Sequence, residues 1–157
     1  MKSSRPLVIA AFCILILTFP FLAFAQKGDK DARPMPFDEG KATQHFYLLK
    51  NGGAVELAAK DPADKPTIDA IQKHLESQAK NFEKGNFDVP TTEKGKLPES
   101  VNTMKKLRKE ITFEVMQMDA GAALRMFSVN TQARQAIQDF LKQQIEERHT
   151  GDPMEVQ

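Results

Sequence analysis

The sequence has very little cysteine. Cys13 is the only one in 157 residues, and it lies in an apolar run near the N-terminus. If the segment up to Ala25 is removed, the mature chain contains no cysteine. Such a chain forms no disulfide bond and has no thiolate to act as a nucleophile or to bind zinc, an iron–sulfur cluster or a c-type haem. We therefore expect packing alone to stabilise the fold.

Long apolar runs are also scarce, and the one that exists is at the N-terminus. In residues 1–25, two basic residues precede an apolar run over 7–19, then Pro20, and then Ala23-Phe24-Ala25. This is the pattern of a signal peptide that is cleaved before Gln26, since small residues occupy the −3 and −1 positions. The alternative is an uncleaved anchor, for which the run before Pro20 is short. The pattern predicts an exported protein, periplasmic or secreted, with no membrane segment after cleavage.

An excess of one sign of charge is missing as well. Loss of Lys2 and Arg5 reduces the 22 basic residues to 20, against 21 acidic ones. A near-neutral chain argues against nucleic acid or an anionic membrane as the main partner. The densest basic run, Lys105 to Lys109, falls on a short amphipathic helix, and we expect it to be a solvated face.

Recognisable catalytic patterns are absent from the sequence. It contains no glycine-rich phosphate-binding loop and no G-x-S-x-G nucleophile elbow. Ser77, Ser100 and Ser128 have no His or Asp context that indicates a triad. Because no acid is paired with a base as catalysis requires, the sequence favours a protein that is not an enzyme.

The segments that remain predict a single α+β domain over residues 44–151. We expect residues 26–43 to be a flexible lead-in, because they are polar and contain several prolines, and residues 152–157 to be a disordered tail. Within the domain, alternation of apolar and polar residues predicts strands, and helical spacing predicts helices. The expected elements are strands 45–49 and 54–59 around an Asn51-Gly52 type I′ turn, a helix 64–84, a loop and short helix 85–111, strands 112–118 and 123–129, and a helix from about 130 to 149.

Two ββα units, 44–84 and 112–149, match each other locally. We interpret the match as an internal duplication, although two unrelated amphipathic hairpin–helix segments would also produce it. The predicted fold is therefore an antiparallel four-stranded sheet with helices packed on one face. The matching segments are Gly52–Leu57 with Gly121–Met126, Asp61 with Asn130, Ala70-Ile71-Gln72 with Ala136-Ile137-Gln138, Leu75 with Leu141, and Gln78 with Gln144.

The strand pattern indicates a binding surface. If Leu49 pairs with Ala54, one face of the sheet carries the residues that meet the helices, and the opposite face is too apolar to be left in water. We expect this second face to form a homodimer or to bind a protein partner; the alternative is that loop 86–98 or a helix covers it. The side chains expected to form the surface are Tyr47, Leu49, Met116, Met118 and Phe127.

The histidines are the candidates for a second function. Of the three, His45 and His74 could hold a transition metal or a haem with help from carboxylate or water. No two histidines have the spacing of a specific metal motif, and unrelated surface or boundary positions are the simpler explanation. His74 takes the place that Phe140 has in the second unit, which indicates partial burial.

Three methionines raise the alternative of copper(I). Thioether sulfurs favour soft metals, and Met116, Met118 and Met126 belong to one predicted hairpin. The expected register points Met126 to the other face from Met116 and Met118. Packing is therefore the simpler interpretation.

The first unit also resembles a group of small exported bacterial proteins that usually have no known activity. The residues that carry the resemblance lie between His45-Phe46 and Pro90, including Asp61-Pro62-Ala63-Asp64 and Gly85-Asn86-Phe87, and the second half fits through Ala136-Ile137. Members of the group are sometimes labelled aspartate carbamoyltransferase, an enzyme that resembles nothing in this chain. The resemblance implies metal or haem binding by His45 and His74. Relatives often have His where this chain has Gln138 or Lys94, so several implied ligands are missing here.

Overall fold

The computed structural model describes residues 35–87 and 97–157, which form an α+β fold. The expected four-stranded antiparallel sheet with three helices is confirmed. Residues 1–34, with the expected signal peptide, and 88–96 lie outside the described part. The elements, with two short 3₁₀ turns (η), are η1 Glu39–Lys41, β1 Ala42–Leu49, β2 Gly52–Ala59, α1 Lys65–Glu83, α2 Glu99–Lys106, η2 Arg108–Glu110, β3 Thr112–Met118, β4 Gly121–Phe127 and α3 Thr131–Arg148.

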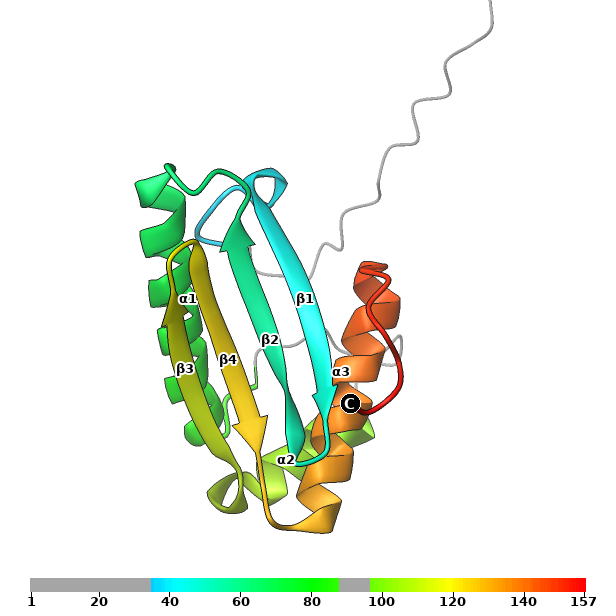
Figure 1. Cartoon of the computed structure of the whole chain (residues 1–157). Coiled ribbons are helices and arrows are strands. Elements are labelled where there is room, and N and C mark those ends of the chain that lie inside the picture. Colours follow the sequence, from blue (N-terminus) through cyan, green and yellow to red (C-terminus); the bar gives the residue numbers. More distant parts are fainter. Residues whose placement is uncertain (1–34, 88–96) are drawn as a thin grey trace, which may run out of the picture. The chain divides into compact units, whose positions relative to one another are not determined.

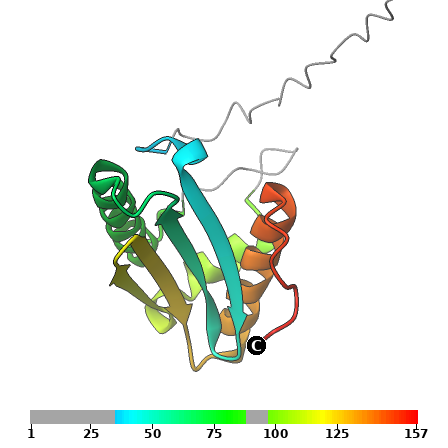
Figure 2. The ribbon, with the colours of Figure 1, turned by 45° about the horizontal axis from the view of Figure 1, so that its top comes forward.

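The sheet has the strand order β1-β2-β4-β3, so the second strand of each hairpin lies in the centre (Figure 1). The central pair is antiparallel, and Val55 of β2 lies opposite Leu124 of β4. The helices all cover the same side of the sheet (Figures 1 and 2). An antiparallel sheet can have one covered and one open face, because its hairpin connections do not have to cross either face.

The first hairpin differs from the predicted register but keeps the predicted faces. Leu49 pairs with Gly52, and Ala54 pairs with Tyr47 rather than with Leu49. The turn is therefore Lys50-Asn51, and neither residue has the positive φ that a type I′ turn requires, so the predicted Asn51-Gly52 turn is wrong. The register error is two residues. Since side chains alternate with a period of two, every residue stays on its predicted face.

Two glycines are required where the hairpins meet. Gly52 adopts φ +149, and a Cβ on it would collide with the backbone oxygen of Met126. A Cβ on Gly121 would collide in the same way with the backbone oxygen of Leu57. Both positions therefore need a residue without a side chain, which explains why glycine recurs at matching places in the two hairpins.

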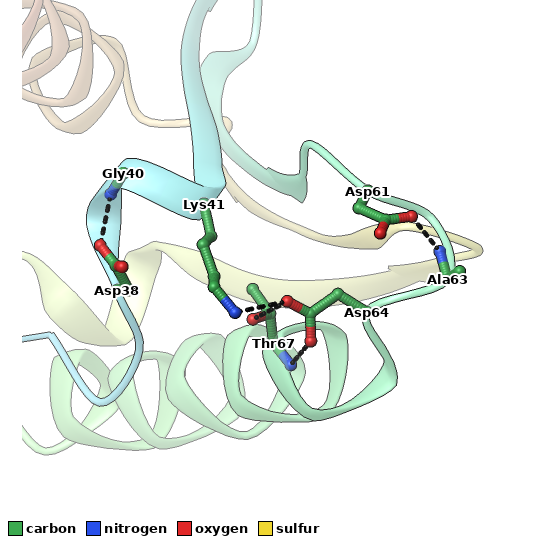
Figure 3. Close-up of polar contacts among 7 residues, drawn as sticks. All are labelled: Asp38, Gly40, Lys41, Asp61, Ala63, Asp64 and Thr67. Atoms are coloured by element: carbon green, nitrogen blue, oxygen red, sulfur yellow. Dashed lines mark hydrogen bonds and ion pairs between the residues drawn. The ribbon is translucent and has the colours of Figure 1, made fainter.

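Order begins earlier than predicted, because residues 38–43 of the expected flexible lead-in are held by polar contacts (Figure 3). Asp38 accepts a hydrogen bond from the Gly40 N–H and caps η1. Lys41 Nζ lies 3.1 Å from a carboxylate oxygen of Asp64, the residue that caps α1. This ion pair connects the start of β1 to the start of the first long helix.

The start of α1 combines several local signals. Asp64 accepts hydrogen bonds from both the N–H and the hydroxyl of Thr67, and Pro66 occupies the first turn, where its missing N–H costs nothing. The hydrogen bond from Lys41 and the two from Thr67 hold the pKa of the Asp64 carboxyl below its ordinary value. In α3 the corresponding cap is Asn130, whose side-chain oxygen accepts from Gln132 and Ala133.

Each long helix packs chiefly over the other unit's hairpin. Helix α1 lies mainly against β3 and β4, whereas α3 lies mainly against β1 and β2 and is flanked by α2 (Figure 1). The buried stripe of α1 includes Ile71 and Leu75, and that of α3 includes Ile137 and Leu141, all at 0 % exposure. Burial of these side chains drives the helices onto the sheet, at about 1.5–3 kcal/mol for each large apolar side chain.

The same hydrogen bonds occur at matching positions of both hairpins. The Ala59 N–H donates to the Ala120 oxygen, and the Ser128 N–H donates to the Asn51 oxygen. The Gln72 amide of α1 donates to the carbonyls of Met118 and Gly121 at the β3–β4 turn. The Gln138 amide of α3 donates to the Leu49 carbonyl at the β1–β2 turn. Each helix therefore fastens the turn of the hairpin that it covers.

The C-terminal tail, residues 152–157, makes specific contacts where disorder was predicted. Asp152 bonds to β1, the Gln157 N–H donates to the Leu48 oxygen over 2.9 Å, and Met154 packs against the core. The prediction failed because the tail is polar and short, and its partners lie more than 100 residues away in sequence. Figure 1 shows the tail descending from α3 toward β1.

Candidate functional site: the open face of the sheet

The open face is the side of the sheet opposite the helices. The alternation of β1 and β3 places Tyr47 and Leu49, and Met116 and Met118, on this side, and Phe127 of β4 joins them. The structure thus brings all five predicted surface residues onto one face. They form two groups, one of Tyr47, Leu49 and Phe127 near the β1–β2 turn, and one of Met116 and Met118 near the β3–β4 turn.

Large apolar side chains remain accessible on the open face. Met116 is 46 % exposed, and Tyr47, Leu49, Met118 and Phe127 are half-buried by their neighbours in the sheet. By contrast, residues one position away in sequence, such as Phe46 and Leu48, are at most 2 % exposed under the helices. The two faces of the same strands therefore differ in cover, and the open face also carries the charged residues Glu56, Glu114 and Arg125.

Arg125 links the two apolar groups. Its guanidinium lies 3.7 Å from the Glu114 carboxylate, 3.8 Å from the Met116 sulfur, and 5.6 Å from the centre of the Phe127 ring. A guanidinium can pair with a carboxylate and rest on an aromatic ring at once, because its charge is delocalised over a plane. The arrangement holds the arginine flat along the face.

Tyr47 occupies a partly desolvated position on the open face. Burial, with the neighbouring Glu56 carboxylate as a second cause, raises the pKa of the Tyr47 hydroxyl above its ordinary value. The hydroxyl is therefore protonated at neutral pH and available as a hydrogen-bond donor. Tyr47 combines an apolar ring with one polar group, a combination that is common at protein interfaces.

The alternative was that a helix or loop 86–98 covers the open face, and the structure decides this for the helices only. Helices α1, α2 and α3 all lie on the other side of the sheet (Figure 2). Most of loop 86–98 lies outside the described residues. Among residues 35–87 and 97–157, no helix lies over the open face.

The structure does not bring His45 and His74 together. His45 belongs to β1 and lies on the open face, where its Nδ1 is 2.9 Å from a carboxylate oxygen of Asp152. His74 belongs to α1, on the helical side of the sheet, and packs edge-on against Phe37 with ring centres 5.9 Å apart. One ion or one haem therefore cannot be shared by these two side chains. Within the described ranges, no three His, Cys, Asp or Glu side chains cluster as metal ligands would.

His74 lines a small cavity between the long helices and the sheet. The cavity has a volume of about 50 Å³ and is also lined by Gln78, Gln144 and Arg148. Burial, and to a lesser extent the positive charge of Arg148, lowers the pKa of His74 below its ordinary value. A neutral imidazole at this place matches Phe140, its counterpart in the second unit and also a lining residue. The predicted partial burial is confirmed.

The methionines are divided as the predicted register requires. Met126 is fully buried under the helices, whereas Met116 and Met118 lie on the open face. The three thioethers therefore do not converge on one ion.

Asp152 is a contact residue of this region that the sequence did not indicate. It binds both His45 and the Phe46 N–H, and its side chain is 11 % exposed. The only available signal was Pro153, which limits the conformation of the preceding residue to extended forms. That signal does not identify a partner.

Comparisons with protein-family models, with curated proteins and with solved structures find no match to the chain. The resemblance to small exported bacterial proteins therefore stays a prediction. In the described residues, no helix is long and apolar enough to cross a membrane.

Proposed function

We propose that the protein is an exported, non-enzymatic binding module that associates with a second copy of itself through the open face of the sheet. The observation that supports this function is the open face itself, with Met116 at its exposed end and four half-buried apolar neighbours. Exposed large apolar side chains gathered on one face in this way usually mark an interface.

A second copy is the occupant that the charges on the face favour. Arg125 and Glu56 lie in diagonal positions on the neighbouring strands β4 and β2, and Glu114 is paired with Arg125. A face that carries both signs can be complementary to itself, because a two-fold axis brings the acid of one copy toward the base of the other. The two apolar groups on either side of Arg125 would then supply the buried area.

The test is a single charge placed in the apolar group. We expect sedimentation velocity to show a dimer of the wild-type chain and a monomer of Met116→Glu, because a buried unpaired carboxylate opposes association. Circular dichroism should show an unchanged fold, since Met116 is already 46 % exposed in the monomer. Leu49→Glu places the same charge in the other apolar group and should act in the same direction.

The matched control is Ser77→Glu. It adds the same side chain at an exposed position of α1, on the helical side of the molecule, and should leave the dimer intact. A wild-type monomer, or a dimer that persists in both Met116→Glu and Leu49→Glu, would falsify the proposal.

We also propose that the two ββα units arose by duplication. The support is the recurrence of Gly52 at Gly121 and of the Gln72 bond at Gln138, at positions that the sequence match had already paired. Two unrelated hairpins have no physical reason to share a helix-to-turn hydrogen bond across units.

Sequencing of the mature N-terminus, with Gln26 as the expected first residue, tests the proposed export.

A further inference from the structure

The outer edge of β1 is occupied by the chain's own C-terminal tail. In an antiparallel sheet, backbone groups of alternate residues point toward and away from the neighbouring strand. The Phe46 N–H and the Leu48 oxygen point away from β2, and both have partners in the tail: a carboxylate oxygen of Asp152 at 2.9 Å and the Gln157 N–H at 2.9 Å. The tail therefore satisfies edge groups that would otherwise be open to pairing.

The carboxylate of Asp152 is the main anchor of the tail. One oxygen lies 2.9 Å from the His45 Nδ1, and the other accepts from the Phe46 N–H. Burial alone would raise the pKa of Asp152, but the hydrogen bonds from His45 and Phe46 outweigh it and leave the pKa below its ordinary value. Two adjacent donors on one strand thus form a carboxylate clamp, which we define as the His45 ring and the Phe46 N–H.

The tail fills the edge without forming a strand. Its two contacts with edge backbone groups come from one side chain and from the last residue, Gln157, with no regular ladder between them. It is also joined to α3 through two residues with positive φ, His149 at 51° and Gly151 at 74°. A segment held by two contacts with the edge and one packed side chain, Met154, and preceded by a sharp turn is easier to displace than a paired strand.

We propose that the edge of β1 is a docking site for an extended peptide that carries an acidic side chain, and that the C-terminal tail occupies this site as an internal ligand. An incoming extended segment can place its carboxylate in the clamp and continue along Phe46 and Leu48 as an added strand. This site lies along the edge of β1 and shares with the open face only the His45 ring, so it does not depend on dimerisation there.

The tail itself indicates the chemistry of the partner. Asp152 enters the clamp, and Met154, two residues later, packs against the core. Residues two apart in an extended segment point to the same side. The preferred partner is therefore a segment with an acidic residue followed, two positions later, by an apolar one. Glu155 and Val156 are exposed and contribute no comparable contact.

The experiment uses the full chain with Asp152→Ala, which weakens the internal ligand, and a labelled synthetic peptide of the sequence 150–157. Fluorescence anisotropy should show at least about tenfold tighter peptide binding to Asp152→Ala than to wild type, since the tethered wild-type tail competes at an effective concentration in the millimolar range. A peptide with alanine in place of its aspartate should lose about tenfold or more in affinity for the variant.

Two matched variants keep the result interpretable. Glu155→Ala removes an exposed carboxylate of the same tail and should bind the peptide no better than wild type. Adding His45→Ala to Asp152→Ala should weaken peptide binding again, because half of the clamp is lost. Equal binding by wild type and Asp152→Ala, or equal binding of the aspartate and alanine peptides, would overturn the proposal.

Two other outcomes would also overturn it. If Asp152→Ala unfolds the domain by circular dichroism, the tail is a structural element and not an exchangeable ligand. If the wild-type chain forms a dimer that Asp152→Ala abolishes and Met116→Glu leaves intact, the tails are exchanged between copies and the occupant is a second copy of the chain. A dimer that Met116→Glu abolishes and Asp152→Ala leaves intact is formed through the open face.

Discussion

The two ββα units of this molecule share their scaffold and differ at their borders. Both units have a glycine where the two hairpins pair and a glutamine that joins the long helix to the turn of the other unit's hairpin. They differ at the sheet edges, since the tail covers β1 and no part of residues 35–87 or 97–157 pairs with the outer edge of β3. The shared positions hold the fold together. The open face is built from both units, whereas the docking site at the edge of β1 lies where the units differ.

The largest expected effect comes from the glycines. Gly52→Ala and Gly121→Ala should each reduce the free energy of unfolding by about 3 kcal/mol or more, because the new Cβ collides with backbone of the facing strand. Urea denaturation followed by circular dichroism measures both. The control is Gly151→Ala, where a Cβ meets nothing within 4 Å and only the positive φ opposes it. Very unequal losses at Gly52 and Gly121 would contradict the equivalence of the two units.

The glutamines should give the next largest effect. Gln72→Ala and Gln138→Ala each remove side-chain hydrogen bonds to partly buried turn carbonyls, and each should cost about 1–2 kcal/mol. Exposed Gln135, whose amide reaches only Asp139 on its own helix, is the control, and Gln135→Ala should change stability little. If only one of the two substitutions lowers the free energy of unfolding, the helix-to-turn hydrogen bond does not stabilise both units in the same way.

His74 and Phe140 provide a comparison that depends on pH. The pKa of His74 is lowered in the fold, so the unfolded chain binds more protons, and stability should fall as the pH drops below about 6.5. His74→Phe copies the residue of the second unit and should flatten the pH dependence of the melting temperature between pH 7 and 5. If the melting temperature of the variant depends on pH as steeply as that of the wild type, a group other than His74 causes the loss of stability.

The smallest expected effect is at the helix caps. Asp64→Asn retains an acceptor for Thr67, as Asn130 does in the second unit, but loses the ion pair with Lys41. Because the pKa of Asp64 is lowered in the fold, its contribution is present at neutral pH and is lost as the pH falls below about 4. Thermal melts at pH 7 and pH 3 should therefore show a small deficit at pH 7 only. A deficit that persists at pH 3 would mean that the amide caps poorly.

The sequence predicted the elements and faces because these depend on local periodicity. The alternation of Tyr47, Leu49 and Met116 identifies the open face even when the paired residue is misassigned by two, since the period is two. The strand order could not be read from the chain, because the central contact between Val55 and Leu124 joins residues far apart in sequence. Asp152 and Gln157 escaped prediction for the same reason.

The structure places His45 and His74 apart, and sequence spacing could not reveal this. His45 and His74 are separated by a strand, a turn and half a helix, and their directions depend on which side of the sheet the helix crosses. The helix crosses on the covered side, so the two rings point into different environments. The sequence placed His45 on the outer face of a strand and His74 at a partly buried helix position, but it did not show whether the two side chains lie close together.

The exchange of helices between hairpins has a consequence for how the chain folds. Since α1 rests mainly on β3 and β4 and only partly on β2, most of its apolar face has nothing to pack against while the second half is still being synthesised. The contacts that bury Ile71 and Leu75 join residues distant in sequence, and such non-local topology slows folding and leaves apolar surface exposed meanwhile. We therefore expect a nascent chain stopped before β3 to remain unfolded and to depend on chaperones until its second half is complete.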